Sequence, residues 1–382
     1  MTADMRDPEA DADLAAPLRL RGSAVVYRLY DVGFEIDLGR ALERLRASAP
    51  ERVRPLRREA QAIQIANPPI TVLLAQEPVV IGERALTAEV SARIFDFGVV
   101  SVRARIAAPG ELTWDEFGEF GMVVESSVDI PELCERHLQL LRDRMGDAVE
   151  RPALAPVSEE YVVYRTGEVL DESGRRLLAS ELVRLDVAPL LLNESRPLSA
   201  EARRELLPHR FTYYTDDLAI LTWENALIVD PSDGDTDVMF VLEFANAQLL
   251  ELRYYDALLD AELPRMYTRV AALRTQSRVL LTRRFAPLLA DLQSLVAEST
   301  ELVERVENAL KVTDDVYLAR VYSAALEIFR GRVWRGGIDR KLTIIRDTYG
   351  MLNADSQAGR AELLELTIVL LIVMEIVMAF FR

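Results

Sequence analysis

The C-terminal end of the chain constrains its fold more than any other feature. The nineteen residues from Leu363 to Phe381 contain only three polar side chains, Glu365, Thr367 and Glu375. As an α-helix this run would be about 28 Å long, close to the hydrocarbon thickness of a bilayer. A buried core helix is the alternative, but Ile368–Met374 is apolar on every side and the sequence ends one residue after the run. The sequence therefore predicts one C-terminal transmembrane helix and a tail-anchored membrane protein.

Glu375 is the exceptional residue of this segment. A carboxylate inside hydrocarbon costs about 3 kcal/mol on insertion scales, so we expect it to be protonated or paired. The run contains no glycine, so close packing of helices through small residues is not available. Three interpretations stay open: a hydrogen bond between subunits of an oligomer, snorkelling to the far interface, or a role in an ion path. Glu365 is the second polar contact expected in the anchor.

The residues on both sides of this segment predict its orientation. An excess of basic residues before it favours a cytoplasmic body: Arg332, Arg335, Arg340, Lys341, Arg346 and Arg360. Residues 1–20 are rich in Asp and Ala and resemble neither a secretory signal nor an Arg-rich transit peptide. We therefore predict a disordered acidic tail, a cytoplasmic body and a location in the bacterial inner membrane.

The charge and the cysteine content exclude some classes of protein. The net charge is −17 over 382 residues, which argues against direct sequence-specific nucleic-acid binding and against binding to anionic lipid. The length favours two or three folded units. Cys134 is the only cysteine, so an internal disulfide is impossible.

Residues 21–235 mix short apolar runs with helical patterns. Ser23–Tyr30, Leu86–Phe95 and Val99–Ile106 have the composition of strands, and Ile130–Met145 has that of a helix. This predicts a soluble α+β region with a mixed N-terminal arrangement of sheet and helices, with a possible split into two subdomains near residues 152–156.

From 236 to 362 the apolar residues follow a helical period. Val238, Leu242, Ala245 and Leu249 begin one heptad seam, and further seams recur at 288–306 and 338–352. Such seams on successive helices favour long antiparallel coiled-coil-like helices. The predicted fold class is therefore α+β, with this helical region leading into one C-terminal transmembrane helix.

The sequence contains few groups suited to catalysis. His137 and His209 are the only histidines and are far apart, and neither a Walker loop nor a dinucleotide-binding glycine motif occurs. The acidic loop of residues 230–237 lacks the glycine and glutamate spacing of a calcium loop. We therefore predict no catalytic, cofactor or metal site, and no enzyme.

One group of polar residues shares a helix face. Asn246, Arg253 and Asp260 recur every seven residues, and Asp256 lies one turn before Asp260. They form either a buried interhelical polar network that fixes the register of the helices, a solvated face, or a ligand site.

A second group is basic. The stretch from 264 to 290 contains no acidic residue. It contains six arginines: Arg265, Arg269, Arg274, Arg278, Arg283 and Arg284. In an acidic protein this is a candidate docking surface for RNA, lipid headgroups or an acidic partner. Helical spacing divides the arginines between opposite faces, so an ordinary solvated helix is the competing interpretation.

Several blocks resemble the required-for-meiotic-nuclear-division family, also called domain of unknown function 155. The resemblance covers residues 211–381 and rests on FTYYTDDLAILTWENALIVDP and VLEFANAQLLELRYYDALLDAEL within 211–263, YLARVY at 317–322, Trp334, DRKL at 339–342, Tyr349 and LLELTIVLLIVME at 363–375. The first half is less similar: Arg103 stands where mitochondrial members have a Trp.

The resemblance implies a membrane protein with one C-terminal helix that forms homo-oligomers and supports translation near the membrane. The family has no established catalytic residues. We therefore expect a bacterial, non-enzymatic, oligomeric membrane scaffold that tethers translation or RNA-related machinery, with a protein or ribonucleoprotein partner.

The alternative function is a channel or transporter. Tyr349–Asn353 (YGMLN) superficially resembles the Gly-Met-Asn signature of magnesium channels, although a Leu is inserted and no second span follows. In that case Glu375 would line the ion path.

Overall fold

The computed structural model describes residues 18–48, 53–55, 67–194, 196–232, 234–274 and 315–380, with a few single positions between 290 and 300. The chain forms two compact units. Unit 1 contains Met1–Glu251 and Lys311–Arg330, and unit 2 contains Leu252–Leu310 and Gly331–Arg382. Each unit is described by itself.

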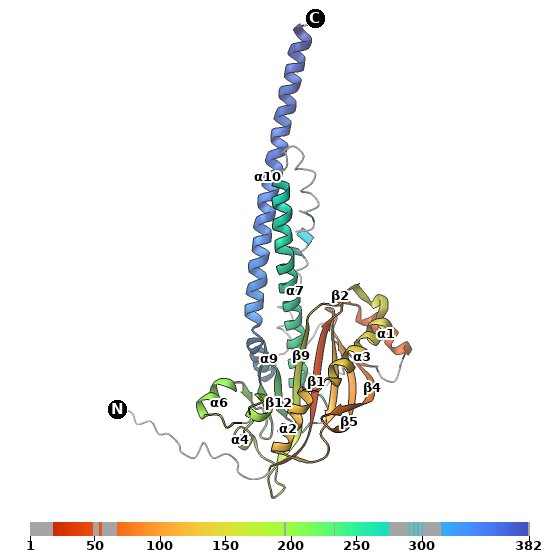
Figure 1. Cartoon of the computed structure of the whole chain (residues 1–382), viewed down its shortest axis with the longest axis vertical. Coiled ribbons are helices and arrows are strands. Elements are labelled where there is room, and N and C mark those ends of the chain that lie inside the picture. Colours follow the sequence, from red (N-terminus) through yellow and green to blue (C-terminus); the bar gives the residue numbers. More distant parts are fainter. Residues whose placement is uncertain are drawn as a thin grey trace, which may run out of the picture. The chain divides into compact units, whose positions relative to one another are not determined.

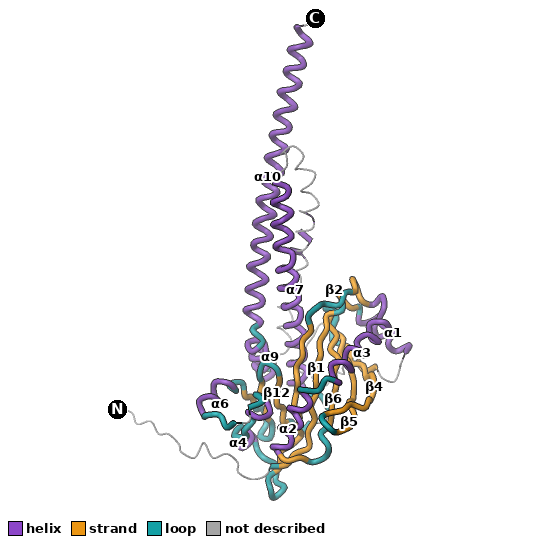
Figure 2. Tube along the Cα trace, in the orientation of Figure 1, coloured by secondary structure: helices purple, strands orange, loops and turns teal. Residues whose placement is uncertain are grey.

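Unit 1 is built on a large mixed sheet, whose strands are orange in Figure 2. The strands are β1 (Arg19–Asp31), β3 (Val53–Pro55), β4 (Ile70–Ile81), β5 (Arg84–Ile94), β6 (Val99–Ala107), β7 (Leu112–Thr113), β9 (Ser158–Leu170), β10 (Arg210–Phe211), β11 (Leu218–Leu221) and β12 (Asn225–Val229). A separate two-stranded sheet pairs β2 (Gly33–Ile36) with β8 (Val149–Pro152).

The order of strands is β10-β11-β12-β9-β1-β6-β5-β4-β3, with β7 attached to β1. Only β12 and β9 pair in parallel, and the other neighbours are antiparallel. At the centre of the sheet, Tyr27 of β1 lies opposite Arg103 of β6 on one side and Tyr161 of β9 on the other. This register decides which polar side chains share a face.

One face of the sheet is covered by helices of unit 1. These helices are α1 (Leu38–Ser48), α2 (Trp114–Glu125), α3 (Asp129–Met145), α4 (Ala179–Leu182) and α5 (Ala188–Leu191), while α6 (Ala200–Leu206) has no buried residue. Helix α2 packs on β1, and α3 packs on β6 and β4 (Figure 1). The core of this layer includes Val26, Val102, Phe117 and Leu133, all buried.

The opposite face lies under the beginning of α7 (Asp237–Arg274) and under α9 (Val316–Ile328). The ring of Phe244 on α7 is tilted against Phe95, which directly follows β5, and against Tyr322 of α9, with ring centroids 5.9 and 6.2 Å away. Just after α9, Phe329 contacts Tyr161 edge-on. The sheet therefore has two buried faces.

The alternation of side chains in β6 explains how one strand serves both faces. Val100, Val102, Ala104 and Ile106 join the apolar core beneath α2 and α3. The residues between them point to the α7 side, because successive side chains of a strand point to opposite faces. This places Arg103 in the layer beneath α7.

Unit 2 contains the second half of α7 and the helix α10 (Gly331–Phe380). They pack through a seam in which Leu259 of α7 and Ile338, Leu342, Ile345 and Leu352 of α10 are buried. Both helices run in the same direction, since Asp256 contacts Gly337 and Lys341 while Asp260 contacts Lys341 (Figure 1). The predicted antiparallel packing concerned successive helices, and the helix expected at 288–306 between α7 and α10 lies almost entirely outside the described residues.

The predicted transmembrane helix is also wrong. In the part of the chain that the structure describes, no helix combines the length and the apolarity needed to cross a bilayer. The longest uninterrupted apolar run at the end of α10 is Ile368–Met374, which is about 10 Å of helix, and Glu375 separates it from the shorter run Ile376–Phe380. The fold class is thus α+β with a mixed sheet, without the membrane span.

Candidate functional site

Four charged side chains meet between the sheet and α7, and we call them the ion layer: Arg93, Arg103, Asp235 and Glu243. Arg93 of β5 forms ion pairs with Glu243 and with Asp235, the latter at 3.3 Å. Arg103 of β6 forms ion pairs with Asp235 and with Glu243, the latter at 3.8 Å. The side chain of Glu243 is fully buried, and Arg93 and Arg103 are nearly so. Two positive and two negative charges therefore balance in a layer that is buried except at Asp235, whose side chain is 36% exposed.

The sheet also orients both guanidinium groups. Arg103 Nε donates a hydrogen bond to Ser91 Oγ at 3.1 Å, and Arg93 Nε donates to Thr71 Oγ1 at 3.5 Å. The Arg93 guanidinium lies 4.8 Å from the centre of the Phe240 ring of α7. These contacts hold the cations where the carboxylates of α7 and its preceding loop can reach them.

The environment of the layer shifts the ionisation of its members. Burial alone would raise the pKa of Asp235, but Arg103 and Arg93 hold it below its usual range. Burial lowers the pKa of Arg93 despite the attraction of Glu243. For Arg103, burial is outweighed by Glu243 and Asp235, which raise its pKa. The lowered pKa of Asp235 and the raised pKa of Arg103 keep these two groups charged at neutral pH.

Three buried side-chain oxygen atoms in or next to the ion layer have no hydrogen-bond partner within the described residues: Tyr27 Oη, Ser101 Oγ and Glu243 Oε1. Tyr27 pairs in register with Arg103, and Ser101 pairs with Arg93. Burial, with Glu243 next in importance, raises the pKa of Tyr27 well above its usual value, so the phenol stays protonated. The described residues of the layer thus combine buried charge with no available nucleophile. This arrangement favours a structural role, in which the ion pairs hold α7 on the sheet.

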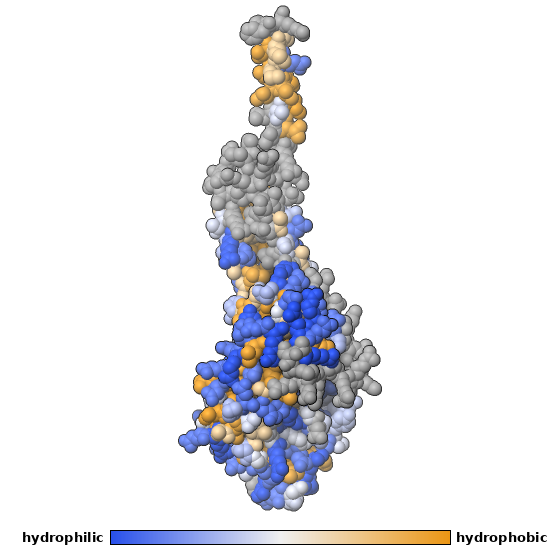
Figure 3. All heavy atoms as spheres, turned by 90° about the vertical axis from the view of Figure 1, so that its right-hand side faces the viewer, coloured by the Kyte–Doolittle hydropathy of each residue, from blue (hydrophilic) through white to orange (hydrophobic). Residues whose placement is uncertain are grey.

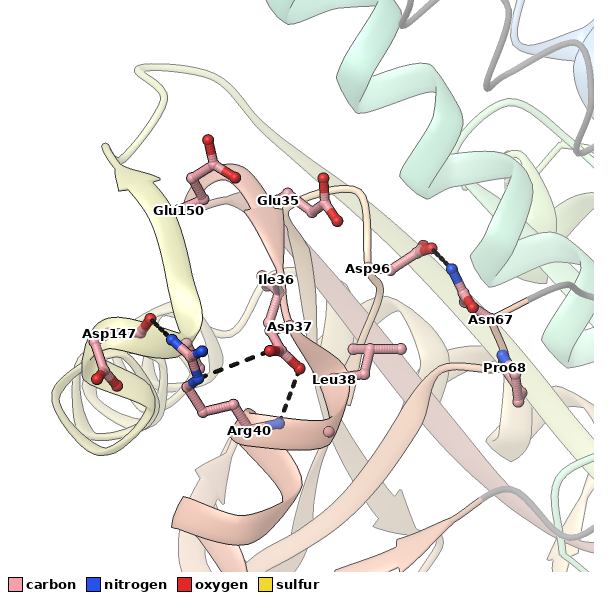
Figure 4. Close-up of a pocket in the computed structure, with 12 residues that line it drawn as sticks. Glu35, Ile36, Asp37, Leu38, Arg40, Asn67, Pro68, Asp96, Asp147 and Glu150 are labelled. Atoms are coloured by element: carbon pink, nitrogen blue, oxygen red, sulfur yellow. Dashed lines mark hydrogen bonds and ion pairs between the residues drawn. The ribbon is translucent and has the colours of Figure 1, made fainter.

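A separate acidic pocket of about 650 Å³ opens beside the two-stranded sheet and the start of α1 (Figure 4). Among the described residues, its lining includes Glu35, Asp37, Asp96, Asp147 and Glu150, against the single basic residue Arg40. The amide of Asn67 donates to Asp96 at 2.8 Å, and the backbone N–H of Arg40 donates to Asp37 at 3.0 Å. The excess of negative charge disfavours nucleotides and other anions in this pocket.

The groups that most often perform catalysis are not arranged for it in the described part of the chain. Burial raises the pKa of the Cys134 thiol to about 12, so it is not a thiolate near neutral pH. His137 Nε2 lies 2.8 Å from Glu77 Oε1. Among the residues whose placement is described, no group of three or more His, Cys, Asp or Glu side chains could hold a metal ion.

The residues of the predicted interhelical network fall into both units. Asn246 is in unit 1, where its amide donates to the carbonyl of Leu242 in the same helix. Asp256 and Asp260 in unit 2 both bind Lys341 of α10, at 2.7 and 2.6 Å. The Arg253 guanidinium lies 5.8 Å from the centre of the Trp334 ring.

Sequence reasoning missed the basic partners in both places. Lys341 is one of only two lysines in the chain. It directly precedes the seam residue Leu342 of α10, and this position could have identified it as a partner of α7. Arg93 and Arg103 each occur in a strand between apolar residues, and this alternation alone indicates a surface arginine. Only the helix that covers the second face makes them buried.

The predicted arginine docking surface can be followed only in part. Arg265 is exposed and bonded to Glu262, one turn earlier. The backbones of Arg269 and Arg274 belong to α7, but their side chains lie outside the described residues, as do Arg278, Arg283 and Arg284 entirely.

The end of α10 is apolar and uncovered, and we call residues 364–378 the apolar end. Eleven large apolar side chains between Leu364 and Met378 are 48% to 63% exposed. They form the orange patch on the upper part of Figure 3. Glu365 and Glu375 are exposed on the same stretch of helix.

Comparison with known proteins places the first unit in a family. A family model described as "Uncharacterized protein MJ0711, N-terminal domain" matches residues 21–236. The uncharacterized protein MJ0711 of Methanocaldococcus jannaschii is 30% identical over 190 residues. That alignment covers 50% of this chain and 57% of the relative, so only about half of each protein is compared. No solved structure matches the chain.

These findings correct the resemblance drawn from the sequence. The assignment to the required-for-meiotic-nuclear-division family is wrong, because the matched family is a different, uncharacterized one. Its model covers 21–236, whereas the motifs that carried the resemblance begin at 211. The relative is archaeal and no membrane-spanning helix is found among the described residues, so the predicted bacterial inner-membrane location and the membrane as a partner are wrong as well.

Proposed function

The chain belongs to the family of the N-terminal domain of the uncharacterized protein MJ0711, and we propose that it is a non-enzymatic scaffold that self-associates through the apolar end of α10. The observation that carries this proposal is the exposure of eleven large apolar side chains on one stretch of helix. A contiguous apolar surface of this kind marks an interaction site, because monomeric proteins rarely expose one.

The free energy available at this surface is large. Fully burying a Leu, Ile, Val or Met side chain contributes about 2 kcal/mol, so eleven half-exposed side chains offer about 10 kcal/mol per chain. Losing the translational and rotational freedom of two proteins costs roughly 4–15 kcal/mol in total. Two apolar ends together can therefore offset the cost of association.

The sequence register supports a second copy of the chain as the occupant. The seam that packs α10 on α7 follows steps of four and three residues through Ile338, Leu342 and Leu352. The same steps lead to Leu370, Val373 and Val377, which are exposed. A heptad seam without a partner is completed by another helix with the same period, and each copy of the chain supplies one.

The charges point to the same occupant. Between Leu364 and Met378 the only ionisable side chains are Glu365 and Glu375, so the surface offers no dense charge to attract a strongly acidic or basic partner. The interaction must then rest on apolar contact, which identical apolar ends provide to each other. The scarcity of catalytic groups in the described residues supports a role without chemistry.

Light scattering on the size-exclusion-purified full chain tests the proposal. We expect a mass of at least two chains that falls on dilution. The variant Leu370→Gln/Val373→Gln/Val377→Gln should be monomeric at the same concentration. Val333→Gln is the matched control, because Val333 is 66% exposed on the same helix but precedes the apolar end.

Three outcomes would refute self-association. The first is a native chain that is monomeric at all concentrations, and the second is a triple variant that keeps the native mass. The third is a chain that binds phosphatidylcholine vesicles while remaining monomeric, which would assign the apolar end to a different occupant.

A further inference from the structure

Two segments that are far apart in the sequence meet at the edge of unit 1 and form a tyrosine cluster. Tyr213 and Tyr214 follow β10, and Tyr317 lies in the first turn of α9. The ring centroid of Tyr213 is 4.9 Å from that of Tyr214 and 5.0 Å from that of Tyr317. Tyr213 is 57% and Tyr214 67% exposed, so two large aromatic faces are open to solvent.

A cleft of about 550 Å³ adjoins this cluster. It lies between β10 and α9 and is lined by Phe211, Asp315, Val316, Ala319, Arg320, Ser323, Ala324 and Glu327. The Arg320 guanidinium lies 5.9 Å from the centre of the Phe211 ring. The cleft thus continues the aromatic surface along α9.

Carboxylates surround Tyr317. Burial raises its pKa, the negative charges of Asp217, Asp230 and Asp315 raise it further, and the positive charge of Arg320 lowers it by less. Burial likewise raises the pKa of Asp237, and Asp230 and Asp315 add to that shift. Asp230 and Asp315 therefore act on both Tyr317 and Asp237.

The local structure explains why the carboxylates stay together. Asp217 is buried and accepts hydrogen bonds from the backbone N–H groups of Tyr213 and Tyr214, at 2.8 and 3.0 Å. Asp315 caps α9 by accepting from the backbone N–H groups of Tyr317 and Leu318. The same two carboxylates that add negative charge thus also fix the backbones that carry the tyrosines.

We propose that the tyrosine cluster beside this cleft binds a basic segment of a partner protein, with an arginine or lysine side chain seated against the exposed rings of Tyr213 and Tyr214 near Asp230. A cation over an aromatic face is attracted by the ring, and nearby carboxylates strengthen the attraction. The aspartates would repel the phosphates of a nucleic acid. The described carboxylates do not form a group suited to a metal ion, which favours an organic cation.

Fluorescence anisotropy on the full-length chain with a labelled hexa-arginine peptide tests this proposal. A hexa-citrulline peptide has nearly the same shape without the charge and is the ligand control. Because the chain carries a net charge of −17, the decisive comparison is between variants at 300 mM NaCl, where diffuse attraction is screened.

We expect Tyr213→Ala/Tyr214→Ala and Asp230→Asn each to raise the dissociation constant of hexa-arginine roughly tenfold. Tyr267→Ala is the aromatic control, since Tyr267 is 53% exposed on α7 in unit 2. Glu83→Gln is the charge control, since Glu83 is exposed in the turn between β4 and β5. Both controls should bind like the native chain.

Equal binding of hexa-citrulline would overturn the proposal, as would unchanged hexa-arginine binding by the tyrosine variant. Binding of single-stranded oligouridylate at the cleft, lost in the same variant, would assign the surface to RNA instead. Displacement of the peptide by micromolar magnesium would assign the carboxylates to a metal ion. Each outcome is independent of the mass measured for the apolar end.

Discussion

Replacing Glu243 with glutamine disturbs the ion layer without changing its shape. The amide keeps the size of the carboxylate and can still accept the hydrogen bond from Arg93. It removes one of the two negative charges, so two buried guanidinium groups are left with Asp235 alone. The structure therefore predicts an unpaired positive charge between the sheet and α7.

The expected cost follows from the geometry. At the 3.8 Å that separates Arg103 from Glu243, two unit charges attract by about 4 kcal/mol at an effective dielectric constant of 20. Removing one partner of a buried ion pair typically costs 3–5 kcal/mol, because the other charge stays buried. We therefore expect Glu243→Gln to lower the free energy of unfolding by about 4 kcal/mol.

Urea denaturation at pH 7 measures this loss. Trp114 and Trp223 both belong to unit 1 and report its unfolding by fluorescence. The double variant Arg93→Met/Glu243→Gln is the control, because it restores charge balance by leaving Arg103 with Asp235. It should recover at least about 2 kcal/mol relative to the sum of the two single variants.

A loss below 1 kcal/mol for Glu243→Gln would refute the reasoning, since it would mean that the layer is hydrated or that Glu243 is neutral. Single variants whose losses simply add would also contradict it. In that case Arg93 and Glu243 would not act as a pair.

Two further predictions concern the turns beside the sheet. Burial raises the pKa of Asp31 to about 7, although the hydrogen bond that its carboxylate accepts from the backbone N–H of Gly33 acts in the opposite direction. The folded state binds this proton more tightly than the unfolded state does. Protonated Asp31 therefore contributes fully to the free energy of unfolding below about pH 4, and this contribution falls by about 4 kcal/mol as the pH rises to 7. Asp31→Asn should flatten this part of the pH profile of urea midpoints, and a profile that keeps its slope would contradict the assignment. Gly98→Ala should destabilise by roughly 3 kcal/mol, because φ is +93° and the new Cβ would lie 1.9 Å from the Gly33 carbonyl oxygen. Gly110→Ala has a similar φ but open space, so a urea midpoint as low as that of Gly98→Ala would disprove the steric argument.

The sequence predicted many of the local elements correctly. The strand expected at Val99–Ile106 is β6, and the helix expected at Ile130–Met145 is α3. The seam through Ile338, Leu342 and Ile345 is buried in unit 2. These features depend on the spacing of apolar residues along one segment, which can be seen in the sequence itself.

The candidate sites depended on contacts between distant segments. Arg93 and Glu243 are 150 positions apart, and the tyrosine cluster joins Tyr213 to Tyr317. The sequence around these residues does not predict either contact, because Arg, Glu and Tyr also occur on solvated surfaces.

The sequence by itself therefore determined which residues form strands and helices and where the apolar surface of each element lies. Only the tertiary structure decided which surfaces are covered, that α7 and α10 run in parallel, and that two strand arginines are buried with carboxylates. The physical reason is that hydrophobic periodicity acts within a few residues, whereas burial and charge pairing depend on which distant segments pack together.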